Sequence, residues 1–293
     1  MPDRLDVLKT YKLFINGAFP RSESGRSMPL CAGERVMVHL CKASRKDLRD
    51  AVEAARAAAD KWAAATAYNR GQILYRMAEM MEGKRRELSE AVACVPAPAS
   101  KSRRRAVSPE DEVTRSIDRL ICFAGWADKY AQVLGCNNPV SGPYYNFTIT
   151  EPTGVVAVIT PDAPPLLGLI TLLAPVLSAG NTAVVLAGGP NPIPAAVLGE
   201  VCATSDVPAG VVNILTCDRA ELLKFVSGHR DIDAVHGANL SSPDATILRE
   251  GVAENVKRVT IRADVNFIDA DCDSARWIEP FVEMKTVWHP ASI

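Results

Sequence analysis

The sequence predicts a doubly wound α/β fold, in which a Rossmann-like parallel sheet carries helices on both faces. Beyond Gly154, short apolar runs alternate regularly with segments of helical character. Apolar strands separated by helices form right-handed crossovers and a sheet that is buried on both faces. The chain has 293 residues, 48% of them apolar, so it is long enough to bury such a core.

The N-terminal part predicts strands first and helices afterwards. Between Tyr11 and His39, the runs YKLFING and ERVMVHL surround turn residues, which is typical of strands and a hairpin. Ser44 is a suitable N-cap with Asp47 three residues later, and the Ala-rich segment that follows has apolar residues at helical spacing. We therefore expect a helix after Ser44.

Two further helices precede the alternating region. The apolar spacing predicts one helix from about Arg70 to Ala93, and another that begins at Pro109 with acidic residues in its first turn. Between them, the prolines and clustered charge of VPAPASKSRRR predict an exposed loop.

The alternating region supplies the predicted sheet. Its strands are GVVAVIT, TAVVLA, GVVNIL, IDAVHG and VKRVTIR, and its helices are residues 166–179, IPAAVLGEVCAT, RAELLKFVSG and SPDATILREGVA. Ligand crevices in such sheets lie at the carboxyl ends of the strands. The loops at 160–165, 187–193 and 236–242 are therefore expected to line a crevice.

Charge and cysteine spacing disfavour several classes of partner. The 33 basic and 34 acidic residues nearly cancel, so nucleic acid and anionic membranes are not expected partners. We find no signal-peptide pattern and no apolar stretch long enough to span a bilayer, which predicts a cytoplasmic protein. The eight cysteines form no Cys-x-x-Cys pair, and the four histidines are not at ligand spacing to them, so neither a metal site nor a disulfide framework is expected.

The loop after the first sheet strand is unusual for a ligand cradle. VITPDAPP offers three prolines and one carboxylate between a strand and a helix, and almost nothing that could perform chemistry. The surrounding sequence contains, in order, TYKLFINGAFPRSESGRS, EPTGVVAVITP, LAPVLSAGNTAVVLA, DVPAGVVNILT and NVKRVTIRADVNFIDADCD. These segments resemble the N-terminal and cofactor-binding parts of the aldehyde dehydrogenase superfamily.

This resemblance implies a catalytic set that the chain does not match. The family uses an attacking Cys thiolate, an Asn side chain in the oxyanion hole and a Glu that acts as general base. Where the family reads Pro-Trp-Asn-Phe-Pro, Ala163 stands at the Asn position. Where the family reads Thr-Leu-Glu-Leu-Gly-Gly, Arg262 replaces the Glu. We therefore expect no catalytic residues in this chain.

The cofactor positions are also altered. The family's ribose-contacting Lys corresponds to Ala187, and its Phe-Thr-Gly-Ser corresponds to Val235-His236-Gly237-Ala238. No cofactor is expected, and NAD(P) binding stays an alternative. The resemblance places that alternative site at Thr160, Pro161, Gly188, Gly189 and Gly237.

The family's catalytic domain is expected to be absent. Shortly after Asp269-Ala270-Asp271 the sequence continues into FVEMKTV, which resembles the C-terminal strand of full-length family members and implies an internal deletion. Cys272 lies between two aspartates that disfavour its thiolate, so it is a poor nucleophile. The expected divisions are N-terminal strands and helices of the cofactor-binding domain (1–141), an oligomerisation arm (142–152), a Rossmann-like core (153–271) and a C-terminal tail with an oligomerisation strand (272–293).

Two segments resemble the family's assembly elements. In the family the C-terminal strand joins the oligomerisation sheet of a neighbouring subunit, and GPYYNFTITEP has the aromatic and β-branched alternation of the arm. The residues expected to assemble are Tyr144, Tyr145, Phe147, Met284, Thr286 and Trp288.

These features predict a non-catalytic, aldehyde-dehydrogenase-like subunit that assembles with itself or with a full-length aldehyde dehydrogenase. One alternative is an NAD(P)-binding oxidoreductase component whose catalytic Cys comes from a partner chain. Another is a small-metabolite binding module that uses Asp162, Arg262 and His236. A third is that the arm and the C-terminal strand simply pack within one monomer.

Overall fold

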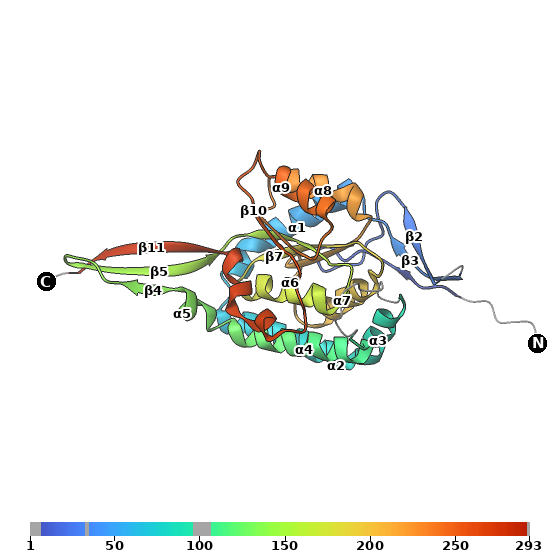
Figure 1. Ribbon diagram of the computed structural model, residues 1–293, viewed down its shortest axis with the longest axis horizontal. Coiled ribbons are helices and arrows are strands. Elements are labelled where there is room, and N and C mark those ends of the chain that lie inside the picture. The colour runs from blue at the N-terminus through green and yellow to red at the C-terminus, as the bar shows by residue number, and fades with distance from the viewer. Residues whose placement is uncertain (1–6, 33–34, 96–106, 292–293) are drawn as a thin grey trace, which may run out of the picture.

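The computed structural model describes residues 7–32, 35–95 and 107–291, and its centre is a five-stranded parallel sheet (Figure 1). The strand order is β10-β9-β6-β7-β8. From β6 the chain moves outward to β7 and β8, and then returns to place β9 and β10 on the other side of β6. This confirms the predicted doubly wound α/β fold. The strands are β6 (Val155–Ile159), β7 (Thr182–Ala187), β8 (Val212–Thr216), β9 (Ala234–Ala238) and β10 (Arg258–Arg262).

The strands β6 to β9 are buried at every position and most of their side chains are apolar, whereas the edge strand β10 is only half-buried. In β6, Val156 and Val158 enter one hydrophobic cluster. Val155, Ala157 and Ile159 enter a second cluster on the opposite face. Successive side chains of a strand point to opposite faces, so a strand covered on both sides has no polar alternation.

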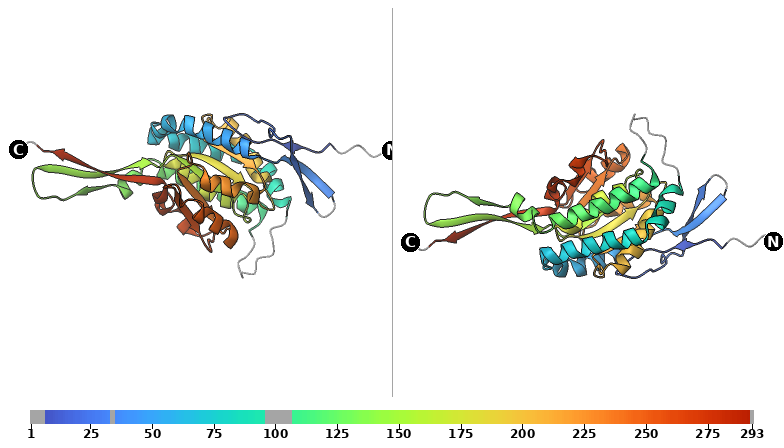
Figure 2. Two further views of the ribbon diagram at one scale, coloured as in Figure 1. Left: turned by 90° about the horizontal axis from the view of Figure 1, so that it is seen from above. Right: turned by 90° about the horizontal axis from the view of Figure 1, so that it is seen from below.

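Helices cover both faces in unequal depth (Figure 2). On one face α6 (Leu167–Ser178) and α7 (Ile193–Thr204) pack on the strands, and α2, α3 and α4 pack outside them. On the other face α1 and α8 cover the sheet, with α9 beside α8. The remaining bounds are α1 (Arg45–Ala63), α2 (Ala67–Gly83), α3 (Arg85–Ala93), α4 (Pro109–Trp126), α5 (Tyr130–Leu134), α8 (Arg219–Gly228) and α9 (Ser242–Glu250).

The helix starts follow the sequence signals. Ser44 and Asp47 form a complete capping box at α1, and Pro109 opens α4 beneath the Ser108 cap. The single helix expected from Arg70 to Ala93 is wrong, because the chain leaves helical geometry at Lys84, directly after Gly83. The loop expected at VPAPASKSRRR lies almost entirely outside the described residues.

A small sheet of β1 (Thr10–Tyr11), β3 (Arg35–Cys41) and β2 (Ser27–Ala32) lies at one end of the body. Asn16 and Gly17 both have positive φ, 53° and 74°, and form the tight turn expected of an Asn-Gly pair. A bridge from Phe14 to Ile214 attaches this region to the edge strand β8.

A narrow antiparallel sheet, called the arm below, projects from the opposite end of the body (Figures 1 and 2). It consists of β4 (Cys136–Asn138), β5 (Tyr144–Pro152) and β11 (Val282–Pro290) in the order β11-β5-β4. Three short 3-10 turns, Ala270–Asp273, Ala275–Trp277 and Glu279–Phe281, lead from the region after β10 into β11. Both segments expected to assemble with other chains therefore lie in one sheet of this chain.

Candidate functional site

The predicted crevice residues gather at the carboxyl ends of the central strands, as the fold requires. Thr160 and Pro161 directly follow β6, and Gly188 and Gly189 directly follow β7. Gly237 lies within β9, where it pairs with Ile159 of β6 and Ile261 of β10. The structure thus brings the five residues to the same edge of the sheet.

The side chains of this edge contact one another closely. The Thr160 hydroxyl is buried, and it lies within hydrogen-bonding distance of the carbonyl oxygens of Leu186 (3.1 Å) and Gly188 (3.2 Å). Pro161 packs directly against Gly168 of α6. A methyl group added at Gly237 would lie 2.9 Å from the side chain of Leu240, so Leu240 covers this glycine.

An arginine that the sequence reasoning missed crosses the crevice. Nη2 of Arg219 donates to the carbonyl oxygens of Thr160 (2.8 Å) and Gly188 (3.1 Å), and to the Asp162 carboxylate at 2.9 Å. Its Nη1 lies 3.4 Å from the carboxylate of Asp244 in α9. We call Asp162, Arg219 and Asp244 the crevice bridge. It joins the loops after β6 and β7 to α8 and α9.

The crevice bridge lies directly over the two glycines that follow β7. A methyl group added at Gly188 would lie 2.9 Å from Cβ of Arg219, and one added at Gly189 would lie 2.7 Å from Oδ1 of Asp162. The glycines therefore make room for the chain's own arginine and aspartate. One sequence signal could have drawn attention to Arg219. It stands in the first turn of a helix, where a positive charge is unfavourable because it opposes the helix dipole.

The start of α6 is also occupied by a side chain of the protein. Glu112 of α4 is 4% exposed, and its Oε1 accepts the backbone N–H groups of Leu166 (2.7 Å) and Leu167 (3.1 Å). A free helix N-terminus is a ready anion site, and here the anion is Glu112. Burial raises the pKa of this carboxyl group. The two hydrogen bonds lower it by less, so the net shift is upward.

The residues at the family's catalytic positions do not form a reactive group. Ala163 is half-buried in the loop after β6 and offers no side-chain donor. Arg262 ends β10, where its guanidinium lies 4.2 Å from the centre of the Trp277 ring and donates to the Arg276 carbonyl. Burial lowers the pKa of Arg262.

His236 is fully buried beside this stacked pair. Its ring lies 4.5 Å from Phe281 and 5.8 Å from Trp277, measured between ring centres. Nδ1 lies 2.9 Å from the Leu172 carbonyl, which only accepts, so Nδ1 carries the hydrogen. Burial lowers the pKa of His236 to about 3, with a smaller contribution from the charge of Arg262. The ring is therefore neutral at physiological pH.

The three residues of the metabolite-module alternative thus fall into two groups. Asp162 belongs to the crevice bridge, whereas His236 and Arg262 pack against Trp277. Cys272 is buried, and burial is the main reason why its pKa is raised, with the nearby aspartates adding to it. Among the described residues, no group of three or more His, Cys, Asp or Glu side chains is arranged to hold a metal ion.

The second candidate site is the arm. All nine residues of β11 pair with β5, in a register from Val282 opposite Pro152 to Pro290 opposite Tyr144. This is the pairing within one chain that the monomer alternative describes, and it differs from the expectation that this strand joins a neighbour's sheet. Within the described chain, the outer edge of β11 has no strand beside it.

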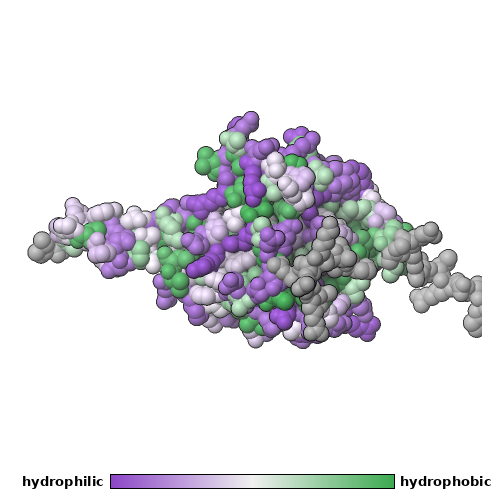
Figure 3. Space-filling view, in the orientation of Figure 1, coloured by the Kyte–Doolittle hydropathy of each residue, from purple (hydrophilic) through white to green (hydrophobic). Residues whose placement is uncertain are grey.

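The residues expected to assemble are mostly exposed on this arm. Tyr144 is 47% and Trp288 58% exposed, and they form an edge-to-face pair with ring centres 5.8 Å apart. Tyr145, Met284 and Thr286 are also exposed, whereas Phe147 is half-buried. Figure 3 shows apolar side chains among the polar ones of the arm.

The sequence and the fold both have close counterparts among known proteins. Retinal dehydrogenase 2 from Mus musculus is 32% identical over 279 residues, and these cover 92% of this chain and 52% of that protein. Aldehyde dehydrogenase, cytosolic 1, from the same organism is 33% identical over 274 residues, which cover 90% and 53%. The chain therefore spans about half the length of the curated relatives it matches.

Solved structures are matched over a similar share of their length. An aldehyde dehydrogenase from Bacillus cereus, in its complex with NAD+, superposes with a TM-score of 0.79 at 28% identity, and the match covers 87% of this chain and 51% of that one. In the described part of the present chain, no helix is long and apolar enough to cross a membrane. The model of the aldehyde dehydrogenase family matches residues 24–287. With its fold and its relatives in agreement, the chain belongs to the aldehyde dehydrogenase family.

Proposed function

We propose that the protein is a non-catalytic member of the aldehyde dehydrogenase family that assembles, through its arm, with itself or with a full-length aldehyde dehydrogenase, as a structural or regulatory subunit. The observation that carries this proposal is the arm itself. It leaves the body as a narrow sheet, and its aromatic pair, Tyr144 and Trp288, is about half exposed.

An arm of this kind is unfavourable for a solitary protein. The open edge of β11 presents backbone N–H and C=O groups that a further strand can pair with, and such edges cause aggregation unless they are covered. Exposed Tyr and Trp side chains are enriched in protein interfaces. A partner chain would cover the edge and the aromatic pair together.

The crevice supports the non-catalytic part of the proposal. We infer that a dinucleotide does not fit the crevice in the present arrangement, because Arg219 and Asp162 lie over Gly188 and Gly189, and Leu240 covers Gly237. The positions of the family's oxyanion donor and general base hold Ala163 and Arg262, which can perform neither role. Only short turns separate the region after β10 from β11, so we further propose that the family's catalytic domain has been lost from between them.

The first experiment measures mass by light scattering, on the purified chain and after co-expression with a full-length aldehyde dehydrogenase. We expect a homo-oligomer or a stable mixed complex, and Trp288→Ser should shift either one toward monomer. Tyr68→Ser is the matched control, since Tyr68 is 70% exposed on α2 and is not part of the arm. A monomer that ignores the dehydrogenase would refute the proposal.

The dinucleotide alternative needs a separate measurement. The melting temperature is recorded with NAD+, NADP+ and AMP for the wild type and for Arg219→Ala, which removes the cation of the crevice bridge. A ligand that binds only the folded state raises the melting temperature. A clear shift of the wild-type protein with NAD+ or NADP+ would favour the oxidoreductase component over the non-catalytic subunit.

A further inference from the structure

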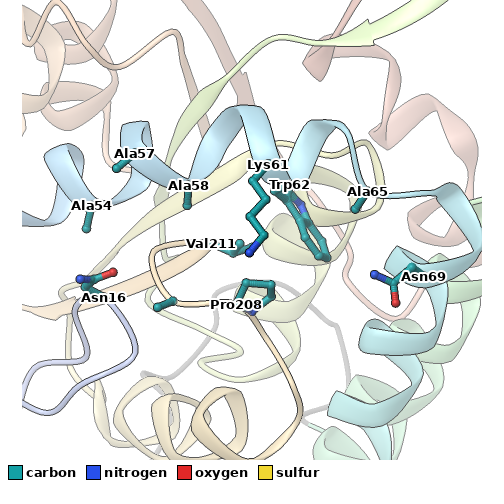
Figure 4. Close-up of a pocket in the computed structure, with 11 residues that line it drawn as sticks. Asn16, Ala54, Ala57, Ala58, Lys61, Trp62, Ala65, Asn69, Pro208 and Val211 are labelled. Carbon is teal, nitrogen blue, oxygen red and sulfur yellow. The ribbon is translucent and has the colours of Figure 1, made fainter.

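A pocket of about 350 Å³ lies at the edge of the sheet opposite the crevice (Figure 4). It is bounded by α1, by the turn at Asn16 and by the loop Pro208–Val211, which leads into the amino end of β8. None of the residues that line it belongs to the crevice or to the arm. The function proposed above therefore does not use this pocket.

The walls of the pocket are apolar because α1 is rich in alanine. Ala54, Ala57 and Ala58 face the cavity at successive helical positions, and small side chains at these positions leave open space. The opposite wall is fixed in place by Gly210. A methyl group added there would lie 2.5 Å from the Ala54 carbonyl oxygen, so only glycine allows the loop to approach α1 this closely.

Three polar side chains border this apolar space. Lys61 extends from α1 toward Pro208 and Val211, and the amides of Asn16 and Asn69 stand on two opposite sides (Figure 4). All three residues are exposed to solvent, and within the described part of the chain none of their side-chain ends takes part in a hydrogen bond or an ion pair. Lys61 thus differs from Lys46 of the same helix, which lies 3.9 Å from Asp50.

We propose that this pocket binds a small monocarboxylic acid with an aromatic or branched aliphatic body. The ammonium group of Lys61 pairs with the carboxylate, and the apolar body packs on the alanine wall. The site supplies one cation, so a second charge on the ligand would lie unpaired against the apolar wall, which is costly. At about 30 Å³ for each water-sized group, the volume admits roughly ten non-hydrogen atoms.

The test compares phenylacetate with phenylacetamide and phenethylamine, which have nearly the same shape but carry no charge or a positive charge. Binding to the full chain is measured by titration calorimetry and by chemical-shift changes of the Trp62 indole N–H. We expect saturable binding of phenylacetate, and binding at least tenfold weaker for the other two compounds, because a charge-assisted hydrogen bond is worth about that factor or more.

Two variants locate the ligand. Lys61→Gln keeps a polar side chain, one atom shorter, and removes the charge, so it should weaken phenylacetate binding at least tenfold, whereas the matched Lys46→Gln should leave it unchanged. Ala57 is exposed, so Ala57→Leu is compatible with folding and should weaken binding by filling the pocket. Equal affinity for phenylacetamide, full binding by the Lys61 variant, or no saturable binding at millimolar phenylacetate would overturn the proposal.

Discussion

Replacing His236 by asparagine should remove a loss of stability that the wild-type protein shows as the pH falls from 8 to 5. The His236 ring is fully buried between α6 and the C-terminal turns, and burial lowers its pKa from 6.5 to about 3. In the unfolded chain the ring binds a proton near pH 6.5, whereas the folded chain keeps it neutral. The unfolded state therefore holds more protons throughout this interval.

The sign and the size follow from that difference. As the pH is lowered, the free energy of unfolding decreases wherever the unfolded state binds the extra proton. The decrease is about 1.4 kcal/mol for each pH unit once the ring is fully protonated in the unfolded chain. With a folded pKa of about 3, the loss between pH 8 and pH 5 amounts to about 2 kcal/mol. Asparagine does not titrate, and its amide nitrogen can replace Nδ1 as the donor to the Leu172 carbonyl.

The assay is urea unfolding at pH 8, 7, 6 and 5, followed by tryptophan fluorescence. The free energy of unfolding is compared between the wild type and His236→Asn, with His289→Asn as the control because His289 is exposed on the arm. The raised pKa of the buried Glu112 acts in the opposite direction, but it is common to all three proteins and cancels in the comparison. Parallel pH profiles for the wild type and the His236 variant would refute the reasoning.

Three further predictions concern other buried groups. Glu112→Ala leaves two buried N–H groups of α6 without an acceptor, so we expect a loss of about 3 kcal/mol in the free energy of unfolding at pH 7. The control variant Glu110→Ala should cause a much smaller loss. Equal losses for the two variants would contradict the role of Glu112. Gly210→Ala places a methyl group 2.5 Å from the Ala54 carbonyl at a φ of 83°, and urea unfolding should show a loss of about 2 kcal/mol or more, whereas unchanged stability would mean that the loop moves freely. Burial lowers the pKa of Lys257 from 10.5 to about 8, so between these pH values the unfolded state binds more protons than the folded state. The free energy of unfolding should therefore increase as the pH rises through this interval, by up to about 3 kcal/mol. Lys257→Met should lack this increase when unfolding is measured from pH 7.5 to 10.5.

The sequence predicts the central layers well because their signals are local. The buried strands are mostly apolar and lack polar alternation, and helix starts carry caps such as Ser44 with Asp47. The break at Lys84 was missed because the apolar spacing continues across it, and Gly83 was its only local sign. A glycine inside a helical pattern does not by itself require a break.

The occupants of the crevice could not be predicted in the same way. Arg219 binds Asp162 across 57 positions of the chain, and Glu112 reaches Leu166 across 54. No spacing rule connects residues so far apart, and only the assembled sheet brings them together. The sequence indicated which family groups are missing at Ala163 and Arg262, but the structure was needed to find what fills the space.

The arm pairs an early part of the chain with a late one, so it can be completed only near the end of synthesis. Thr148 of β5 meets Thr286 of β11 although 138 positions separate them. When the ribosome has finished β5, its partner has not yet been made, and the whole central sheet must be translated before β11 emerges. Throughout that time the nascent arm exposes the β5 edge that β11 later covers. A strand from another chain that meets the arm in this interval competes directly with β11, so the timing of encounter would influence whether the protein closes on itself or pairs with a neighbour.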